Sequence, residues 1–475
     1  MSVLWTAKDA AAATGGKYTR DWSATGISID TRTIEAGDLF IALKDVRDGH
    51  DFVAQALEKG AAAALVSHVP DDVPTDAPLL IVDDVLVALE DMARAARART
   101  DAQVIAVTGS VGKTSTKEML RVVLGQQGRV HAAEASYNNH WGVPLTLARM
   151  PQNTQFAIIE IGMSHPGEIS PLAKIASPHV AMVTTVAAAH FEAFGNIEGI
   201  AREKAAIFDG LVAGGKAVIN ADIETTDILR DAAREEIITF GTNPAADFRL
   251  TDVQLADSVT VISATLRGEP ALFKLSTSGR HFAMNAVGVL ACVEAAGADL
   301  GLAANDLTLW EPPAGRGTRE TVHLDLYHPE WSLELIDDAF NANPTSLVAA
   351  LEVLAAAKPR DGVGQVRAGR RVAILGDMLE LGEDAPALHR EIAQAPSMKD
   401  IDRVHCLGPL MRELHETLPE GQRGLWATTA TELAVHVKDM IDAGDVILVK
   451  GSKGSKASLI VDAIRKLGHP APTNE

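Results

Sequence analysis

A glycine-rich turn near residue 110 is the part of the sequence best suited to binding phosphate. It reads Thr108-Gly109-Ser110-Val111-Gly112-Lys113-Thr114-Ser115 and connects a hydrophobic segment, 103–107, to a predicted helix. In that setting backbone N–H groups bind phosphate oxygens, the lysine neutralises the terminal phosphates, and the threonine hydroxyl can bind Mg²⁺. Val107 stands where the pattern G-x-x-x-x-G-K-S/T has its first glycine, so a chance glycine turn is the alternative. The flanking strand and helix favour an ATP site built from Gly109, Ser110, Val111, Gly112, Lys113, Thr114 and Ser115.

Three side chains further along the chain are candidates for a metal site. Glu160 ends the hydrophobic segment 156–160, and open α/β sheets place their ligands at the carboxyl ends of strands. A solvated acidic turn would explain Glu160 equally well. His190 follows another such segment, where it is either a metal ligand or a structural histidine. Lys204 falls in a predicted helix, and on composition alone a solvated lysine is the commoner case.

Paired acids and amides follow a predicted strand near residue 336. Asp337 and Asp338 come first, and Asn341 and Asn343 follow them. Such residues suit contacts with ribose hydroxyls, a metal or an ammonium group, although Asp and Asn are also ordinary turn formers. A basic glycine turn at 449–456 is either a second anion-binding nest or a flexible loop.

The elements that must position these residues indicate an α/β protein with three domains. At 475 residues the chain is too long for one hydrophobic core. Short strands and helices in residues 1–100 predict a small α/β domain. Hydrophobic segments alternate with helices through residues 101–314, which predicts a central parallel sheet. A break rich in proline and glycine at 311–317 precedes a second alternation, which predicts a smaller Rossmann-like domain over 315–475.

Composition and charge exclude several classes of protein. The formal net charge of −20 disfavours binding to bulk nucleic acid or to an anionic membrane. Cys292 and Cys406 are too few and too far apart for a disulfide framework or a metal knuckle, which fits a reducing compartment. The start of the chain does not read as a signal peptide, and no run approaches about 18 apolar residues. We therefore expect a cytoplasmic protein that is not inserted in a membrane.

These segments together resemble the Mur ligase family, and the resemblance extends over all three predicted domains. Besides the shortened phosphate loop, the matching segments are Asp30-Thr31-Arg32, Asp48-Gly49-His50-Asp51-Phe52, Asn138-Asn139-His140-Trp141-Gly142-Val143-Pro144-Leu145-Thr146-Leu147, Glu160-Ile161-Gly162-Met163, Ala189-His190-Phe191-Glu192, Asn285, Arg316, Asp337-Asp338-Ala339-Phe340-Asn341-Ala342-Asn343-Pro344, Leu375-Gly376-Asp377-Met378-Leu379-Glu380-Leu381-Gly382 and Val449-Lys450-Gly451-Ser452. The family lacks the first glycine of the general phosphate loop, which accounts for Val107.

The resemblance implies an ATP- and Mg²⁺-dependent ligase with a small UDP-binding domain, a central ATPase-like domain and a Rossmann-like domain that binds the amine. The implied catalytic residues are Lys113, Glu160, His190 and Lys204. Of these, Glu160 binds one Mg²⁺ together with Thr114, His190 serves a second ion, and Lys204 is carried as an N-carboxylated carbamate. Asn285 is implied to contact adenine, Arg316 a phosphate and Asp338 the ribose.

The resemblance also implies the substrates. The segments at 138–147 and 341–344 point to members that join UDP-N-acetylmuramoyl-tripeptide to D-alanyl-D-alanine through an acyl phosphate, in peptidoglycan precursor synthesis. Thr31 and Arg32 would lie near the nucleotide, Asn138 and Asn139 along the sugar-linked substrate, and Asn341 and Asn343 at the dipeptide. Three residues depart from the family pattern, namely Thr31 for Ser, Val111 for a polar residue and Phe340 for Tyr. We expect a monomer.

Two other classes of protein remain as alternatives. A folylpolyglutamate synthase is also an amide ligase of this superfamily, but the N-terminal UDP-domain segments argue against it. A regulatory or motor ATPase with a phosphate loop would hydrolyse ATP without an acceptor. ADP release that depends on both substrates would distinguish ligation from simple hydrolysis.

Overall fold

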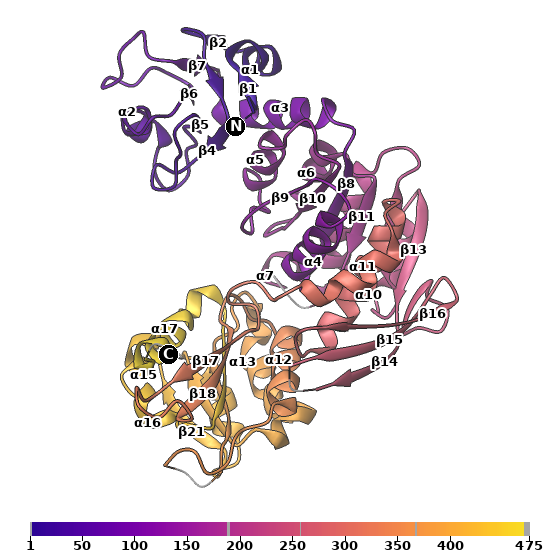
Figure 1. Cartoon of the computed structure of the whole chain (residues 1–475), viewed down its shortest axis with the longest axis vertical. Helices are drawn as coiled ribbons and strands as arrows, with labels where there is room; N and C mark the ends of the chain where they lie inside the picture. The colour runs from indigo at the N-terminus through magenta and orange to yellow at the C-terminus, as the bar shows by residue number, and fades with distance from the viewer. Residues whose placement is uncertain (1, 188–190, 257, 366–367, 470–475) are drawn as a thin grey trace.

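Three sheets of five or more strands follow one another along the chain and define an N-terminal, a central and a C-terminal domain (Figure 1). The computed structural model describes residues 2–187, 191–256, 258–365 and 368–469. The central domain lies between the other two (Figure 1). The expected boundaries after residues 100 and 314 both fall in segments between sheets.

The N-terminal domain contains a five-stranded sheet with the order β2-β7-β6-β5-β4. Its strands are β2 Lys17–Tyr18, β4 Gly26–Ser28, β5 Asp38–Ile41, β6 Ala63–Val66 and β7 Leu79–Ile81. Strands β4 to β7 are parallel, and β2 is an antiparallel edge strand. A separate pair, β1 Trp5–Thr6 and β3 Ser23–Ala24, lies beside helix α1, Ala7–Thr14. Helix α2, Val53–Glu58, packs against β6.

Helix α3, Val85–Ala98, joins the N-terminal domain to the central one. It packs against α5, Gly142–Ala148, of the central domain. Leu89 of α3 and Leu145 of α5 belong to one buried apolar cluster. The indole of Trp5 also donates a hydrogen bond to the carbonyl of Ala148, at 2.9 Å. Apolar burial therefore holds the two domains together.

The central sheet has nine strands in the order β16-β15-β14-β13-β12-β11-β8-β10-β9. The strands are β8 Gln103–Thr108, β9 Val130–Ala132, β10 Phe156–Glu160, β11 Val180–Val183, β12 Lys216–Asn220, β13 Glu236–Gly241, β14 Phe248–Leu255, β15 Thr260–Leu266 and β16 Glu269–Leu275. Strands β8 to β14 pair in parallel, which confirms the predicted parallel sheet, and β14 to β16 form an antiparallel extension.

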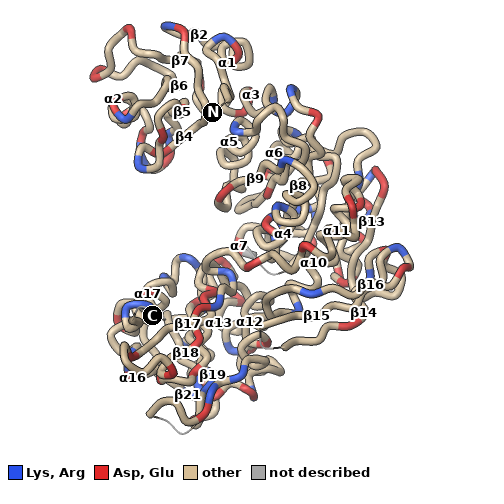
Figure 2. Tube along the Cα trace, in the orientation of Figure 1, with Lys and Arg blue, Asp and Glu red and all other residues tan. Residues whose placement is uncertain are grey.

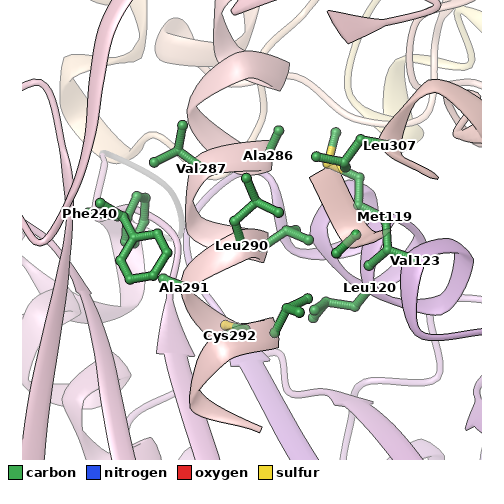
Figure 3. Packing of buried hydrophobic residues seen from close by; sticks show 14 of the residues in the cluster. Met119, Leu120, Val123, Phe240, Ala286, Val287, Leu290, Ala291, Cys292 and Leu307 are labelled. Atoms are coloured by element: carbon green, nitrogen blue, oxygen red, sulfur yellow. The ribbon is translucent and has the colours of Figure 1, made fainter. Parts of the chain in front are cut away.

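Helices cover both faces of this sheet, which explains why its strands read as continuous hydrophobic segments. Ile105 of β8 points into a core beneath α4, Lys113–Gly125, and α10, Arg280–Ala295. Its neighbour Val104 points into the opposite core, beneath α6, Ile169–Ala176, and α8, Ile197–Ala205. Figure 3 shows the first core, where Leu290 of α10 packs beside Met119 and Val123 of α4.

The C-terminal domain has a six-stranded sheet with the order β17-β18-β22-β19-β20-β21. The strands are β17 Thr318–His323, β18 Ser332–Asp338, β19 Arg371–Gly376, β20 Arg403–Leu407, β21 Arg423–Ala427 and β22 Val446–Lys450. All pairs are parallel except β17 with β18. The alternation of strands and helices expected in this part of the chain is confirmed. The sequence did not indicate the edge strands β17 and β21. Strand β17 carries mostly polar residues, and β21 has an apolar run of only three residues, 425–427.

Charged residues of both signs occur along all three domains (Figure 2), with 63 acidic against 43 basic residues in the whole sequence. In the described part of the chain, we find no helix of the length and apolarity needed to cross a membrane.

Replacing Leu290 by Ala tests the packing of the central core. Its side chain is fully buried between α10 and α4, and the substitution leaves a cavity there. We expect Leu290→Ala to lower the free energy of unfolding of the central domain by about 2–5 kcal/mol, measured by urea denaturation. Leu302→Ala, at a side chain that is 53% exposed, is the control and should change little. Equal effects of the two substitutions would contradict this packing.

Candidate active site

The phosphate loop lies between the carboxyl end of β8 and the start of α4. Gly112 has a φ of +86°, and a Cβ there would lie 2.8 Å from the side-chain oxygen of Asn285. Glycine is therefore required both by the backbone conformation and by the close approach of α10. The loop is also tied to the segment after β11, since the Thr184 hydroxyl donates to the Val111 carbonyl at 2.6 Å.

Lys113 begins α4 and points back over the loop. Its Nζ donates to the carbonyl of Gly109 at 2.7 Å. Burial lowers the pKa of Lys113, the nearby Glu160 carboxylate opposes this shift, and Arg316 adds to it. The amine is thus held above the backbone N–H groups at the helix start, the arrangement that binds terminal phosphates.

Glu160 is a buried carboxylate beside this loop. The parallel register of β10 and β8 pairs Glu160 with Val107, and its side chain is 2% exposed. One oxygen, Oε1, accepts from the Thr114 hydroxyl at 3.2 Å and from the amide of Asn138 at 2.7 Å. The other oxygen, Oε2, is buried and has no hydrogen-bond partner among the described residues. The solvated-turn explanation of Glu160 is therefore wrong.

Lys204 is also buried, which excludes the solvated helix face that composition alone favoured. The residue is 2% exposed on α8, and the contact of its Nζ is the sulfur of Met163 at 3.7 Å. Burial lowers the pKa of Lys204 well below its usual value, the charge of Lys113 lowers it further, and Glu203 opposes the shift. His190, the other predicted residue of this group, lies outside the described residues.

The C-terminal domain contributes Asp338 and Lys450 to the site. Asp338, at the end of β18, accepts from Lys450 Nζ at 2.8 Å, and the same amine donates to the Asn341 carbonyl at 3.0 Å. Burial raises the pKa of Asp338, while Lys450 opposes the shift. Asp337 points elsewhere and pairs with Arg465 at 3.0 Å. Only one member of the acidic pair is therefore directed to the site.

Arg316 links the C-terminal and central domains. Its guanidinium stacks 4.1 Å from the ring centre of Phe340 and donates to the hydroxyl of Ser136 at 3.2 Å. Phe340, at the position where the family has Tyr, thus keeps an aromatic surface for the cation although it lacks the hydroxyl.

A cavity of about 720 Å³ collects most of the predicted site residues. Its lining includes Ser110, Val111, Gly112, Lys113, Thr114, Ser115, Asn138, Asn139, Glu160, Asn285, Arg316, Asp338, Asn341 and Asn343. Gly109 lies below the loop surface, and Lys204 lies behind Met163, which lines the wall. Residues predicted separately along more than 200 positions of sequence therefore share one space between the central and C-terminal domains.

Two of the predicted substrate amides also hold the ends of helices. The Oδ1 atom of Asn343 accepts from the N–H of Ser346 at 2.9 Å and caps helix α12, Pro344–Ala356. Likewise Asn139 Oδ1 accepts from the N–H of Gly142 at 2.9 Å, at the start of α5. Part of each side chain's hydrogen-bonding capacity is thus used within the protein.

Thr31 and Arg32 line a separate cavity of about 760 Å³ in the N-terminal domain. The Thr31 hydroxyl donates to Gln55 at 2.7 Å. Arg32 is 81% exposed and hydrogen-bonds Asp30, which lowers the pKa of that carboxyl to about 2. Among the described residues, His140 alone lines both this cavity and the one that contains the phosphate loop.

The sequence did not indicate Ser136, His140 and Lys450 as site residues. Lys450 was predicted within a basic glycine turn whose function was left open, and its burial could not be read from sequence. Ser136 and His140 lie in the loop of residues 133–141 between β9 and α5, hereafter the β9–α5 loop. In that loop, a role had been predicted from the sequence only for Asn138 and Asn139.

Three family models match successive segments of the chain. The model of the "Mur ligase family, catalytic domain" matches residues 23–97, that of the "Mur ligase middle domain" matches 107–293, and that of the "Mur ligase, glutamate ligase domain" matches 328–453. The chain belongs to the Mur ligase family.

Among its relatives, the chain is similar to the UDP-N-acetylmuramoyl-tripeptide--D-alanyl-D-alanine ligase of Bacillus subtilis, with 37% identity over 92% of each chain. The enzyme of the same name from Escherichia coli is 34% identical, over 94% of this chain and 95% of the relative. A crystal structure of MurF from Acinetobacter baumannii is 28% identical, with a TM-score of 0.81, and the match covers 97% of this chain and 98% of that chain.

Lys113→Ala tests the phosphate site. The substitution removes a unit charge held above the loop, and loss of one preorganised donor lowers kcat by about 10²–10³-fold in other enzymes. We expect a fall in kcat of at least that size in an assay of ADP release. Lys174→Ala, at an exposed lysine of α6, is the control. Turnover of Lys113→Ala close to that of the unsubstituted protein would contradict the ATP-site assignment.

Proposed function

We propose that this chain is an ATP-dependent ligase that joins UDP-N-acetylmuramoyl-tripeptide to D-alanyl-D-alanine. The observation that carries the proposal is the single cavity in which the phosphate loop and buried Glu160 of the central domain meet Asp338, Asn341 and Asn343 of the C-terminal domain. A phosphate site that faces a second polar wall suits the transfer of a phosphoryl group between two bound substrates. The names of the relatives supply the identity of those substrates.

The N-terminal cavity suits the UDP-sugar end of the first substrate. Thr31, Lys44, Arg47 and Lys59 line it and give it hydroxyl and cationic groups for a nucleotide diphosphate. From there the peptide reaches the cavity of the phosphate loop past His140, which lines both spaces. Asn138 and Asn139 follow along the same path. ATP occupies the loop of residues 109–115, with adenine toward Asn285 and ribose toward Asp338.

The residues beside the loop fit Mg²⁺, which takes oxygen ligands in sites that use one or two carboxylates together with substrate phosphates. Thr114 offers a hydroxyl, and Glu160 offers a buried oxygen that has no other partner among the described residues. When bound, Mg²⁺ supplies positive charge that offsets the phosphates. We propose Thr114 and Glu160 as its ligands, with His190 serving a second ion.

Lys204 fits the proposed carbamate because its amine is buried without a carboxylate partner at hydrogen-bonding distance among the described residues. Loss of a proton from the ammonium gives the neutral amine, and addition of CO₂ to that amine releases a second proton. The side chain thereby changes from a cation to an anion with two oxygens. An anion beside the phosphate loop would attract a metal ion, whereas an ammonium there would repel one.

The mechanism follows from charge and exclusion of water. The terminal carboxylate of the tripeptide attacks the γ-phosphorus of ATP, ADP leaves, and Lys113 and the loop N–H groups hold the transferring group. The amine of D-alanyl-D-alanine then attacks the carbonyl of the acyl phosphate, and inorganic phosphate leaves as the amide forms. Walls from two domains surround this cavity, which protects the acyl phosphate from hydrolysis.

A coupled assay tests the substrates. We expect ADP release to require both UDP-N-acetylmuramoyl-tripeptide and D-alanyl-D-alanine. We expect it to be far slower with L-alanyl-L-alanine, because the amides of Asn341 and Asn343 should fit one stereochemistry. Running the assay with tripeptides that end in diaminopimelate or in lysine identifies the third residue. Equal rates with the two dipeptides would remove the named acceptor, and ADP release without any acceptor would favour a simple ATPase.

Lys204→Ala tests the carbamate. This variant should be nearly inactive yet still bind ATP through Lys113 and Thr114, and acetate, a small carboxylate that fits the vacated space, should restore part of the activity. Ethylammonium chloride at the same ionic strength is the control and should restore none. Full activity of Lys204→Ala in bicarbonate-depleted buffer would contradict the carbamate.

A further inference from the structure

Lys117 is a buried cation that the proposed mechanism does not use. It lies on α4, one helical turn after Lys113, and its side chain is fully buried. An ammonium group loses several kcal/mol when it leaves water unless charges and hydrogen bonds compensate it. A buried lysine at this position therefore needs hydrogen-bond acceptors or a carboxylate around its amine, whereas an apolar residue would need neither.

The partners of Lys117 belong to α4 and to the β9–α5 loop. Its Nζ lies 2.8 Å from Glu118 Oε1 and donates to the carbonyls of Ala133 at 2.6 Å and Ala135 at 3.4 Å. An ammonium has three donors, and these three acceptors match them. The contact with Glu118 neutralises the charge, and the two carbonyl contacts fix the first half of the loop to the helix.

Ser136 follows directly after the second of these carbonyls. Its hydroxyl lies 3.5 Å from the hydroxyl of Thr114 and accepts from Arg316 at 3.2 Å. It therefore touches both the proposed metal ligand of the central domain and the arginine that comes from the C-terminal domain. The other half of the loop has its own anchor, since the N–H of Gly162 donates to the Asn138 carbonyl at 2.8 Å. Ser136 lies between the two anchors.

We propose that Lys117 is a positioning residue that places the Ser136 hydroxyl between Thr114 and Arg316. Because Lys113 and Lys117 lie on one turn of one helix, the distance from the phosphate loop to the β9–α5 loop is set by helix geometry. The contact between Ser136 and Arg316 then fixes the position of the C-terminal domain relative to the phosphate loop. This inference builds on the proposed function, since it assigns the loop to that reaction.

Lys117→Met tests the proposal, since methionine keeps an unbranched side chain, shorter by the terminal nitrogen, and removes the donors. We expect kcat to fall by about 10²-fold, the loss typical of a misplaced catalytic group, while ADP affinity in metal-free buffer stays unchanged. Hydrogen exchange followed by mass spectrometry should show faster exchange in residues 133–137 than in the unsubstituted protein. Lys174→Met, at an exposed lysine of α6, is the matched control and should alter none of these quantities.

A double-mutant cycle separates positioning from general stability. If Lys117 acts through Ser136, then Ser136→Ala should lower kcat, and adding it to Lys117→Met should lower kcat little further. Effects that multiply, or Ser136→Ala with unchanged kcat, overturn the proposal. Should Lys117→Met not fold, Lys117→Arg keeps the charge but displaces the donors. A folded Arg variant with lower kcat and unchanged exchange in residues 133–137 also overturns it.

The two proposals fail in different ways. An unsubstituted protein that does not ligate UDP-N-acetylmuramoyl-tripeptide to D-alanyl-D-alanine contradicts the proposed function. Hydrogen exchange in residues 133–137 can be measured without any turnover, so unchanged exchange in folded Lys117→Met contradicts the positioning proposal by itself.

Discussion

The buried carboxylate of Glu160 is the constraint on which the site depends. A carboxylate that is 2% exposed is costly unless hydrogen bonds or a cation compensate it. The protein supplies two donors, Thr114 and Asn138, to one oxygen and none among the described residues to the other. The oxygen without a hydrogen-bond partner therefore favours a metal ion at the end of β10, where the phosphates of ATP would also lie. The phosphate loop and the β9–α5 loop are both arranged around this carboxylate.

The active cavity is complete only when the C-terminal domain contacts the central one. Lys113, Thr114 and Glu160 come from the central sheet, whereas Asp338 and Asn341 come from the C-terminal sheet. Arg316 bridges the two through its contacts with Ser136 and Phe340. Such an arrangement couples domain contact to catalysis, because the acceptor cannot meet an acyl phosphate until both walls are in place. It also limits the access of water to that intermediate.

Much of the fold was predictable because apolar patterning follows burial. Strands covered on both faces, such as β8 and β10, read as continuous hydrophobic segments. The edge strands β17 and β21 gave no signal, because β17 is mostly polar and the apolar run of β21 is short. The phosphate loop was predictable for a related reason, since its chemistry depends on local sequence. The burial of Lys117 and Lys204 was not predictable, although the family resemblance had named Lys204 as a site residue. A lysine in an amphipathic helix looks the same in sequence whether its amine meets water or the protein interior. Their burial depends on loops far away in the sequence.

Oxygen transfer from the tripeptide to phosphate tests the central claim that a carboxylate is activated as an acyl phosphate. The tripeptide is labelled with ¹⁸O in its terminal carboxyl group, and the inorganic phosphate released with D-alanyl-D-alanine is examined by mass spectrometry. Attack of the carboxylate on the γ-phosphorus, followed by attack of the amine on the carbonyl carbon, predicts one ¹⁸O atom in each phosphate formed from fully labelled substrate. Unlabelled phosphate accompanied by amide product would contradict the account.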